Sequence, residues 1–182
     1  MRRFRYGTAI IAFFAVIVVV GLLHWGLRPV PKAPLTVGTQ VGQIAPDFTL
    51  TRLNGKGSVR LWSLRGKPVW LNFFASWCPP CNAEAYDLAQ TAKKSPGLDV
   101  IGIDLTASES SISKVDAFVA QYGIAYPVLL DQNNSVANRY GVQAIPTSFF
   151  IDSQGVIRAE VSLPLYPALI KKYLRKIDYP AQ

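Results

Sequence analysis

Hydrophobic and polar positions change their spacing several times along the chain, and each change predicts a different element. After residue 40, apolar positions alternate with polar ones on either side of Asn54-Gly55-Lys56-Gly57, which predicts a β-hairpin. The alternating residues are Phe48 and Leu50 before this turn and Val59 and Leu61 after it. Residues 69–74 are almost entirely apolar, as is typical of a strand buried on both faces. From Cys81 onward, apolar or small residues recur at 4-3-4 spacing, which predicts a helix that ends at Ser95-Pro96-Gly97.

Strands and helices alternate along the rest of the chain. Strands are predicted at residues 98–105, 126–130, 147–151 and 156–161, and helices at residues 112–122, 136–140 and from Pro167 onward. The last two strands are joined by a short turn and should therefore be antiparallel. The alternation predicts an α/β fold with a central, partly parallel sheet that is covered on both faces.

The N-terminal pattern is different. Residues 7–25 contain no formal charge, three arginines precede them, and Trp25 stands at their end. Their length is close to the ~20 residues that span a bilayer, and the arginines should keep the N-terminus in the cytoplasm. A cleaved signal peptide is the alternative, but no Ala-x-Ala-like site follows the apolar run.

This pattern predicts three parts. Residues 1–25 should form a cytoplasmic tip and one transmembrane helix, and the proline-containing residues 26–40 a tether. Residues 41–182 are long enough for one domain with a real core. We therefore expect a single-pass protein of the cell membrane with this domain on the extracytoplasmic side.

The net charge of +8 does not indicate nucleic acid binding. Five of the 19 basic residues flank the apolar run, which leaves 14 basic against 11 acidic residues in the exported part. Lys171, Lys172, Arg175 and Lys176 cluster in the last predicted helix, most simply as a solvated face that would also favour anionic lipid.

The two cysteines of the chain, Cys78 and Cys81, stand where the predicted buried strand gives way to a helix. A thiolate is both a nucleophile and a metal ligand, so the pair indicates disulfide chemistry or half of a metal site. The one histidine, His24, lies in the apolar run, and Asn82 stands where haem attachment would need a histidine. We therefore predict a redox-active dithiol without metal or cofactor. A structural staple is the alternative, although so short a loop adds little stability.

Four segments resemble those of a known family. They are Gly42-x-x-Ala45-Pro46-Asp47-Phe48, Asn-Phe-Phe-Ala-Ser-Trp-Cys-Pro-Pro-Cys at 72–81, Tyr-Gly-Val-Gln-Ala-Ile-Pro-Thr at 140–147, and Phe-Ile-Asp-x-x-Gly at 150–155. Together they look like a thioredoxin-fold protein, closest to the membrane-anchored TlpA, ResA and CcmG (DsbE) group. The resemblance covers roughly residues 40–178. It implies a thioredoxin fold with an N-terminal β-hairpin and a central helix–strand insertion at about 111–131.

Position on the predicted helix suggests roles for the residues of the dithiol motif. Cys78, at the helix start, is the predicted attacking cysteine, and the less exposed Cys81 is the predicted resolving one. Pro79 and Pro80 remove backbone donors from the first helical turn, which argues against a strongly oxidising disulfide. Glu84, one turn beyond Cys81, is the expected base for resolution, as its counterpart in the resembled group implies. An ordinary acid near a helix start is the alternative.

The resemblance adds further candidates. Asn72 stands where cytosolic thioredoxins have a buried aspartate, which favours Glu84 as the proton acceptor. Asn72 itself should be a hydrogen-bonded strand residue. Pro146 should be a cis-proline that faces the dithiol and leaves the backbone of Ile145 to pair with an extended substrate segment. Trp77 should shield the site and contact substrate, with a plain core aromatic as the alternative.

These features predict a membrane-tethered thiol–disulfide reductase. The resemblance implies oxidised protein thiols as substrates, apocytochrome c in particular, and an integral-membrane electron donor that recharges the dithiol. A general oxidase or isomerase stays open, because sequence does not fix the redox potential. A peroxiredoxin-like peroxidase would have Thr or Ser in place of Ala75. A copper- or haem-handling chaperone would need a distal His or Met, which the exported part lacks.

Overall fold

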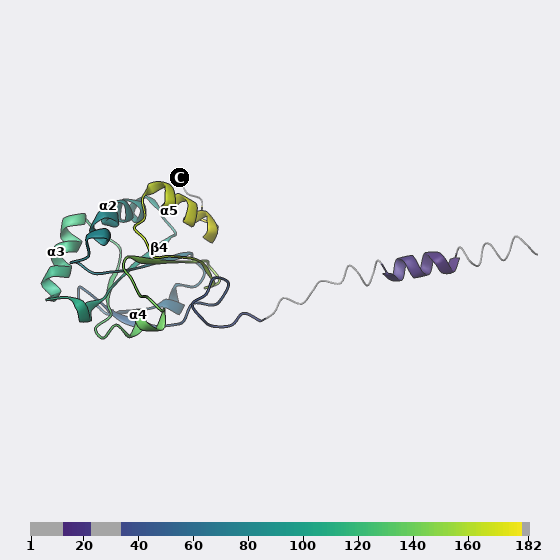
Figure 1. Ribbon diagram of the computed structural model, residues 1–182, viewed down its shortest axis with the longest axis horizontal. Helices are drawn as coiled ribbons and strands as arrows, with labels where there is room; N and C mark the ends of the chain where they lie inside the picture. Colours follow the sequence, from purple (N-terminus) through teal and green to yellow (C-terminus); the bar gives the residue numbers. More distant parts are fainter. Residues whose placement is uncertain (1–12, 23–33, 180–182) are drawn as a thin grey trace, which may run out of the picture. The chain divides into compact units, whose positions relative to one another are not determined.

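The computed structural model describes residues 13–22 and 34–179. The chain divides into two units, Met1–Pro34 and Leu35–Gln182, which are described separately (Figure 1). Residues 13–22 are helical and exposed, and among the described residues no helix is both long and apolar enough to cross a membrane. Much of the predicted transmembrane segment, residues 7–25, lies outside the described residues. The membrane anchor therefore stays a prediction.

A seven-stranded mixed sheet forms the centre of the second unit. Across the sheet, the order is β2 (Ser58–Arg60), β1 (Thr49–Arg52), β5 (Val128–Leu130), β4 (Asp99–Asp104), β3 (Val69–Phe74), β6 (Thr147–Ile151) and β7 (Ile157–Val161). Strands β3, β4 and β5 run parallel, and the other neighbours pair antiparallel. All six residues of β3 are buried, as its apolar sequence predicts for a central strand.

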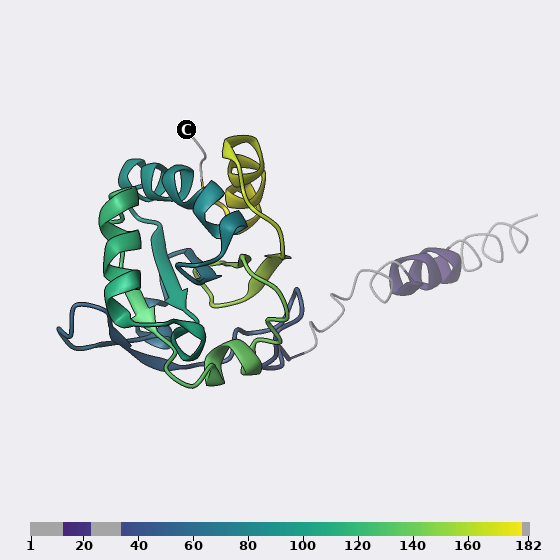
Figure 2. The ribbon, with the colours of Figure 1, turned by 60° about the vertical axis from the view of Figure 1, so that its left-hand side comes forward.

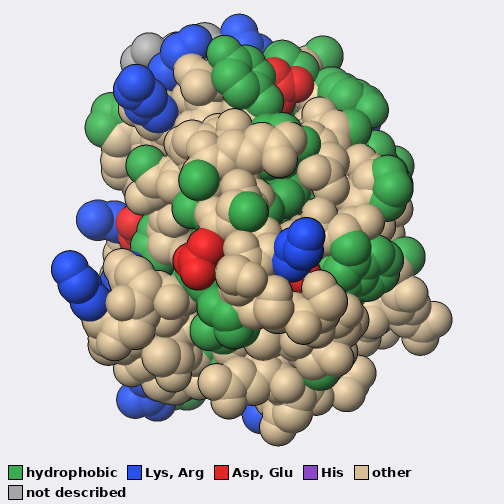
Figure 3. Space-filling model, turned by 90° about the vertical axis from the view of Figure 1, so that its left-hand side faces the viewer, with side chains coloured by type: hydrophobic (Ala, Val, Ile, Leu, Met, Phe, Trp, Pro, Cys, Tyr) green, Lys and Arg blue, Asp and Glu red, His purple; other side chains and the backbone are tan. Residues whose placement is uncertain are grey.

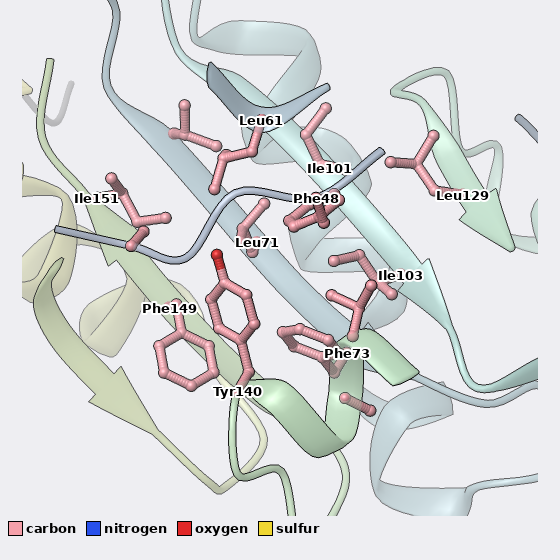
Figure 4. Close-up of a cluster of buried hydrophobic side chains, with 14 of the residues drawn as sticks. Phe48, Leu61, Leu71, Phe73, Ile101, Ile103, Leu129, Tyr140, Phe149 and Ile151 are labelled. Atoms are coloured by element: carbon pink, nitrogen blue, oxygen red, sulfur yellow. The ribbon is translucent and has the colours of Figure 1, made fainter. Parts of the chain in front are cut away.

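Helices cover both faces of this sheet. They are α2 (Pro79–Lys94), α3 (Ile112–Tyr122) and α5 (Pro167–Leu174) on one face and α4 (Ser135–Arg139) on the other, with 3₁₀ turns η1 (Leu61–Leu64), η2 (Thr106–Ser108) and η3 (Arg175–Ile177) (Figures 1 and 2). Side chains of β3 alternate between the faces. Leu71 and Phe73 pack with Tyr140 of the α4 side (Figure 4), whereas Trp70 and Phe74 pack toward α5 and α3.

The architecture is the predicted thioredoxin-like α/β fold. The hairpin β1–β2 extends the sheet beyond β5, and the expected helix–strand insertion is α3 followed by β5. Several predicted strand ends are shifted, and two of the shifts have an identifiable cause. Leu61 starts η1 instead of continuing the hairpin, and the Asp47 carboxylate accepts the next N–H, that of Trp62, at 3.0 Å. Strand β5 begins at Val128, directly after a proline that has no N–H to donate to the ladder.

The compact unit begins before the predicted end of the tether. The N–H of Ile44 donates to the carbonyl of Thr36 at 2.9 Å, and the N–H of Gly38 donates to the carbonyl of Ile44 at 3.0 Å. Residues from 36 onward thus pair with the domain. The tether predicted at 26–40 overlaps the compact unit at its C-terminal end, and its residues 26–33 lie outside the described part of the chain.

Candidate active site

A disulfide joins Cys78 and Cys81 at the start of α2. Cys78 is the N-cap residue, and Pro79 and Pro80 occupy the first helical positions, where a missing N–H breaks no helical hydrogen bond. The N–H of Cys81 donates to Cys78 Sγ at 3.3 Å. The start of the helix and this one N–H are therefore what would stabilise a Cys78 thiolate.

Both cysteines are buried, with Cys78 2% exposed and Cys81 1% exposed. The two exposures have the predicted order, but the difference is very small in the disulfide form. The reason is the loop before β6, whose Ile145 carbonyl oxygen lies 3.6 Å from Cys78 Sγ. Position on the helix, rather than exposure, distinguishes the two sulfurs.

The peptide bond between Ile145 and Pro146 is cis, as the resemblance implied. Strand β6 pairs antiparallel with β3, with Thr147 opposite Phe73. This register brings the residues just before β6 next to those just after β3. The loop with the cis-proline consequently lies against Cys78, at the predicted place.

Trp77 is 56% exposed, so the alternative of a core aromatic is wrong. Its indole N–H donates to the hydroxyl of Ser108 at 3.3 Å, which fixes one edge of the ring. On the face of the domain that includes α3, hydrophobic and uncharged side chains make up most of the surface, with charged side chains scattered among them (Figure 3). An exposed aromatic ring next to the reactive cysteine suits contact with a protein substrate.

Glu84 is 1% exposed, which separates it from an ordinary solvent-facing helix acid. Its two carboxylate oxygens accept hydrogen bonds at 2.7 Å, one from the Asn72 amide and one from the backbone N–H of Leu165. Burial raises the pKa of Glu84 to about 7, and these two hydrogen bonds oppose the rise. A carboxylate of this pKa can take up a proton at neutral pH. Among the described contacts of the disulfide form, neither oxygen is hydrogen-bonded to a sulfur, so its catalytic role stays a prediction.

Asn72 is the hydrogen-bonded strand residue that was expected. Its amide also donates to the hydroxyl of Ser148 at 3.2 Å, which in turn accepts the indole N–H of Trp70 at 2.9 Å. These buried groups form a continuous network from the sheet to Glu84 and the loop before α5. Glu84, on the buried face of α2, is thereby held in one position.

Sequence reasoning missed a second group of polar residues, Ser76, Asp104 and Glu109. Glu109 accepts hydrogen bonds from both the N–H and the hydroxyl of Ser76, at 2.5 and 2.6 Å. Asp104 is fully buried at the end of β4, where β3 and β4 are parallel neighbours. Because carboxyl ends of parallel strands meet at one edge, Asp104 could have been placed near the dithiol from its sequence position. Nothing in the sequence pattern distinguishes Glu109.

The fold and the buried dithiol define a thioredoxin-like thiol–disulfide oxidoreductase. The chain belongs to the AhpC/TSA family, whose model matches residues 41–160. It is 37% identical over 140 residues to the thiol-disulfide oxidoreductase ResA of Bacillus thuringiensis (strain Al Hakam), which covers 76% of this chain and 79% of that protein. It is 36% identical over 149 residues to the thioredoxin-like protein YneN of Bacillus subtilis, which covers 81% of this chain and 86% of YneN.

A solved structure shares the fold. A secreted Mycobacterium tuberculosis disulfide oxidoreductase, homologous to Escherichia coli DsbE, matches with a TM-score of 0.64 and 30% identity, covering 70% of this chain and 94% of that chain. The resemblance to the TlpA, ResA and CcmG group is thus confirmed, and the protein is an enzyme of this class.

Proposed function

We propose that this enzyme is a membrane-tethered, extracytoplasmic thiol–disulfide reductase. The observation that supports the direction of electron flow is the first turn of α2. Pro79 and Pro80 leave the N–H of Cys81 as the nearest backbone donor to Cys78 Sγ. A strong oxidant needs a very stable thiolate, and a single donor at 3.3 Å provides little of that stability.

The reaction is a two-electron transfer to a substrate disulfide. The Cys78 thiolate attacks one substrate sulfur, and the other substrate sulfur leaves as a thiolate, which gives a mixed disulfide. Cys81 then loses its proton to Glu84 and attacks Cys78 Sγ. The substrate sulfur that was bonded to Cys78 leaves as the second thiolate, and the enzyme is left with the Cys78–Cys81 disulfide seen in the structure. An integral-membrane electron donor would restore the dithiol.

The proposed substrate is apocytochrome c, whose haem-binding Cys-x-x-Cys-His motif must be reduced before haem attaches. The dithiol form of the enzyme should reduce a peptide that carries this motif as a disulfide. One peptide disulfide should be reduced for each Cys78–Cys81 disulfide that forms. Thiol release, followed by mass spectrometry, measures this. A matched peptide with the histidine replaced by alanine is the control. Equal rates for both peptides would remove the argument for apocytochrome c and favour a general reductase.

Residues 7–25 are the proposed anchor, with the domain outside the cytoplasm. Full-length protein should stay with membranes after salt and alkaline washing. After mild reduction of the disulfide, an impermeant thiol reagent should label Cys78 in intact cells. Recovery of a mature N-terminus between residues 20 and 45 would show that the segment is a cleaved signal peptide instead.

A further inference from the structure

A second buried carboxylate lies at the end of β4, next to the strand that leads to the dithiol, and has no part in the mechanism above. Asp104 ends β4, pairs in register with Phe74 of β3, and is 0% exposed. Its Oδ1 accepts the hydroxyl of Thr106 at 2.7 Å. Its Oδ2 is buried and, among the described residues, has no hydrogen-bond partner. An ionised carboxylate oxygen without a donor is costly to bury, so the protonation state of this oxygen matters.

Glu109 connects this region to the dithiol loop. Its carboxylate accepts both the N–H and the hydroxyl of Ser76, two residues before Cys78. The side chain of Asn82 donates to the carbonyl oxygens of Ser76, at 3.1 Å, and Cys78, at 2.7 Å. The N–H, the hydroxyl and the carbonyl oxygen of Ser76 are thus all hydrogen-bonded. The backbone leading into α2 is therefore held by a carboxylate from the loop before α3.

The surroundings of Asp104 are acidic. Burial raises the pKa of Asp104 to about 7, Thr106 lowers it, and Glu109 raises it by its charge and as an acceptor that only the protonated acid could use. Asp131 also raises it by charge, while its own Oδ2 accepts the backbone N–H groups of residues 136 and 137 at the start of α4. Asp131 is thus already hydrogen-bonded to the backbone at the start of α4. Glu109 is the neighbour that could accept a proton from Asp104 Oδ2.

We propose that protonated Asp104 donates a hydrogen bond from Oδ2 to Glu109, and that this pair holds Ser76 and so positions Cys78 for attack. Once it is protonated, Oδ2 becomes a hydrogen-bond donor, and Glu109 is its acceptor. When the proton is lost, the charged and fully buried Asp104 repels the half-buried Glu109, and the hydrogen bonds from Ser76 to Glu109 weaken as Glu109 is displaced. Both acids are positioning residues, because they act on Cys78 through Ser76. The inference rests on attack by Cys78 in the proposed function.

Asp104→Asn provides the sharpest test, because an amide can donate to Glu109 at every pH. In oxidised wild-type protein, where the cysteines do not titrate, the NMR signal of the Ser76 N–H should shift with a midpoint near pH 7. This shift should disappear in Asp104→Asn. It should persist in Asp116→Asn, which alters an exposed acid of α3. It should also persist in Glu84→Gln, because Glu84 titrates in the same range but does not contact this pair.

Attack by Cys78 supplies the kinetic readout. In reduced wild-type protein, the rate constant for attack on 2-hydroxyethyl disulfide, divided by the thiolate fraction, should fall as pH rises through about 7. Asp104→Asn should abolish this fall. Glu109→Gln should slow attack about tenfold, which is the order of magnitude expected for the loss of one charge-assisted hydrogen bond. It should also lose the fall in rate near pH 7. Ser76→Ala keeps the backbone N–H, so it should lose less activity and retain this fall in rate.

The outcomes separate this inference from the function itself. If the Ser76 signal does not shift with pH in the wild type, or if the shift survives in Asp104→Asn, the proposed hydrogen bond from protonated Asp104 to Glu109 is wrong. If Asp104→Asn does not fold, the wild-type titration and the loss of the fall in rate in Glu109→Gln decide. Wild-type protein that does not react with the disulfide at all would instead contradict the proposed function.

Discussion

Cys81→Ser accumulates mixed disulfides through Cys78, and Cys78→Ser loses exchange activity. The expected loss in Cys78→Ser is on the order of 10³-fold or more, because no other thiol replaces the nucleophile. Cys78 is the N-cap of α2 and accepts the N–H of Cys81, so its thiolate is the stabilised one. Cys81 lies within the first turn and can attack only the neighbouring sulfur. Non-reducing electrophoresis with an oxidised protein substrate measures the trapped species.

The double variant with serine at both positions is the control for non-specific capture. Burial does not favour either cysteine, since both are nearly inaccessible in the disulfide form. The assignment therefore depends on helix position alone. Trapping through Cys81 in the Cys78→Ser protein would reverse it.

Glu84→Gln slows resolution of the mixed disulfide by an expected factor on the order of 10² at pH 8, the scale of general base catalysis. The pKa of Glu84 is raised to about 7, so the wild-type carboxylate loses its proton as pH rises from 6 to 8. The wild-type resolution rate should rise over the same range, and the rise should be missing in the variant. The substituted amide can still accept the N–H of Leu165, and a flipped Asn72 amide can accept from it. Stopped-flow kinetics of resolution measures the profile.

Glu160→Gln is the matched control, since Glu160 is an exposed acid of β7. It should leave both the rate and the profile unchanged. If Glu84→Gln retains the wild-type rise between pH 6 and 8, Glu84 is a structural anchor for Asn72 and Leu165 and not the proton acceptor.

The elements around the dithiol were predictable because their signals are local. The apolar run of β3 and the helical spacing after Cys81 placed Cys78 at a strand–helix junction, and the family resemblance of residues 140–147 implied the cis-proline that faces it. The role of Glu84 as proton acceptor was suggested by its counterpart in the resembled group and by Asn72, one strand position that differs from cytosolic thioredoxins. Each of these conclusions needs only a short stretch of sequence or a motif.

Contacts between distant segments were not predictable in this way. Ser76 and Glu109 are 33 residues apart, and Leu165 donates to Glu84 across 81 residues. Both contacts depend on how loops at the strand ends fold back over the sheet, which no periodicity encodes. The near-complete burial of Cys78 has the same origin, because the loop before β6 covers it.

The reduction potential of the Cys78–Cys81 couple tests the central claim, that this is a reductase, most directly. Pro79 and Pro80 leave one backbone donor near Cys78 Sγ, so the dithiol gains little from a stabilised thiolate. Equilibration of the domain with glutathione buffers, followed by quantification of the oxidised fraction, gives the value. The account predicts a potential nearer to the ~−270 mV of thioredoxin than to the ~−120 mV of a strong oxidant. A potential above about −180 mV, the level of protein disulfide isomerase, would contradict it and identify an oxidase.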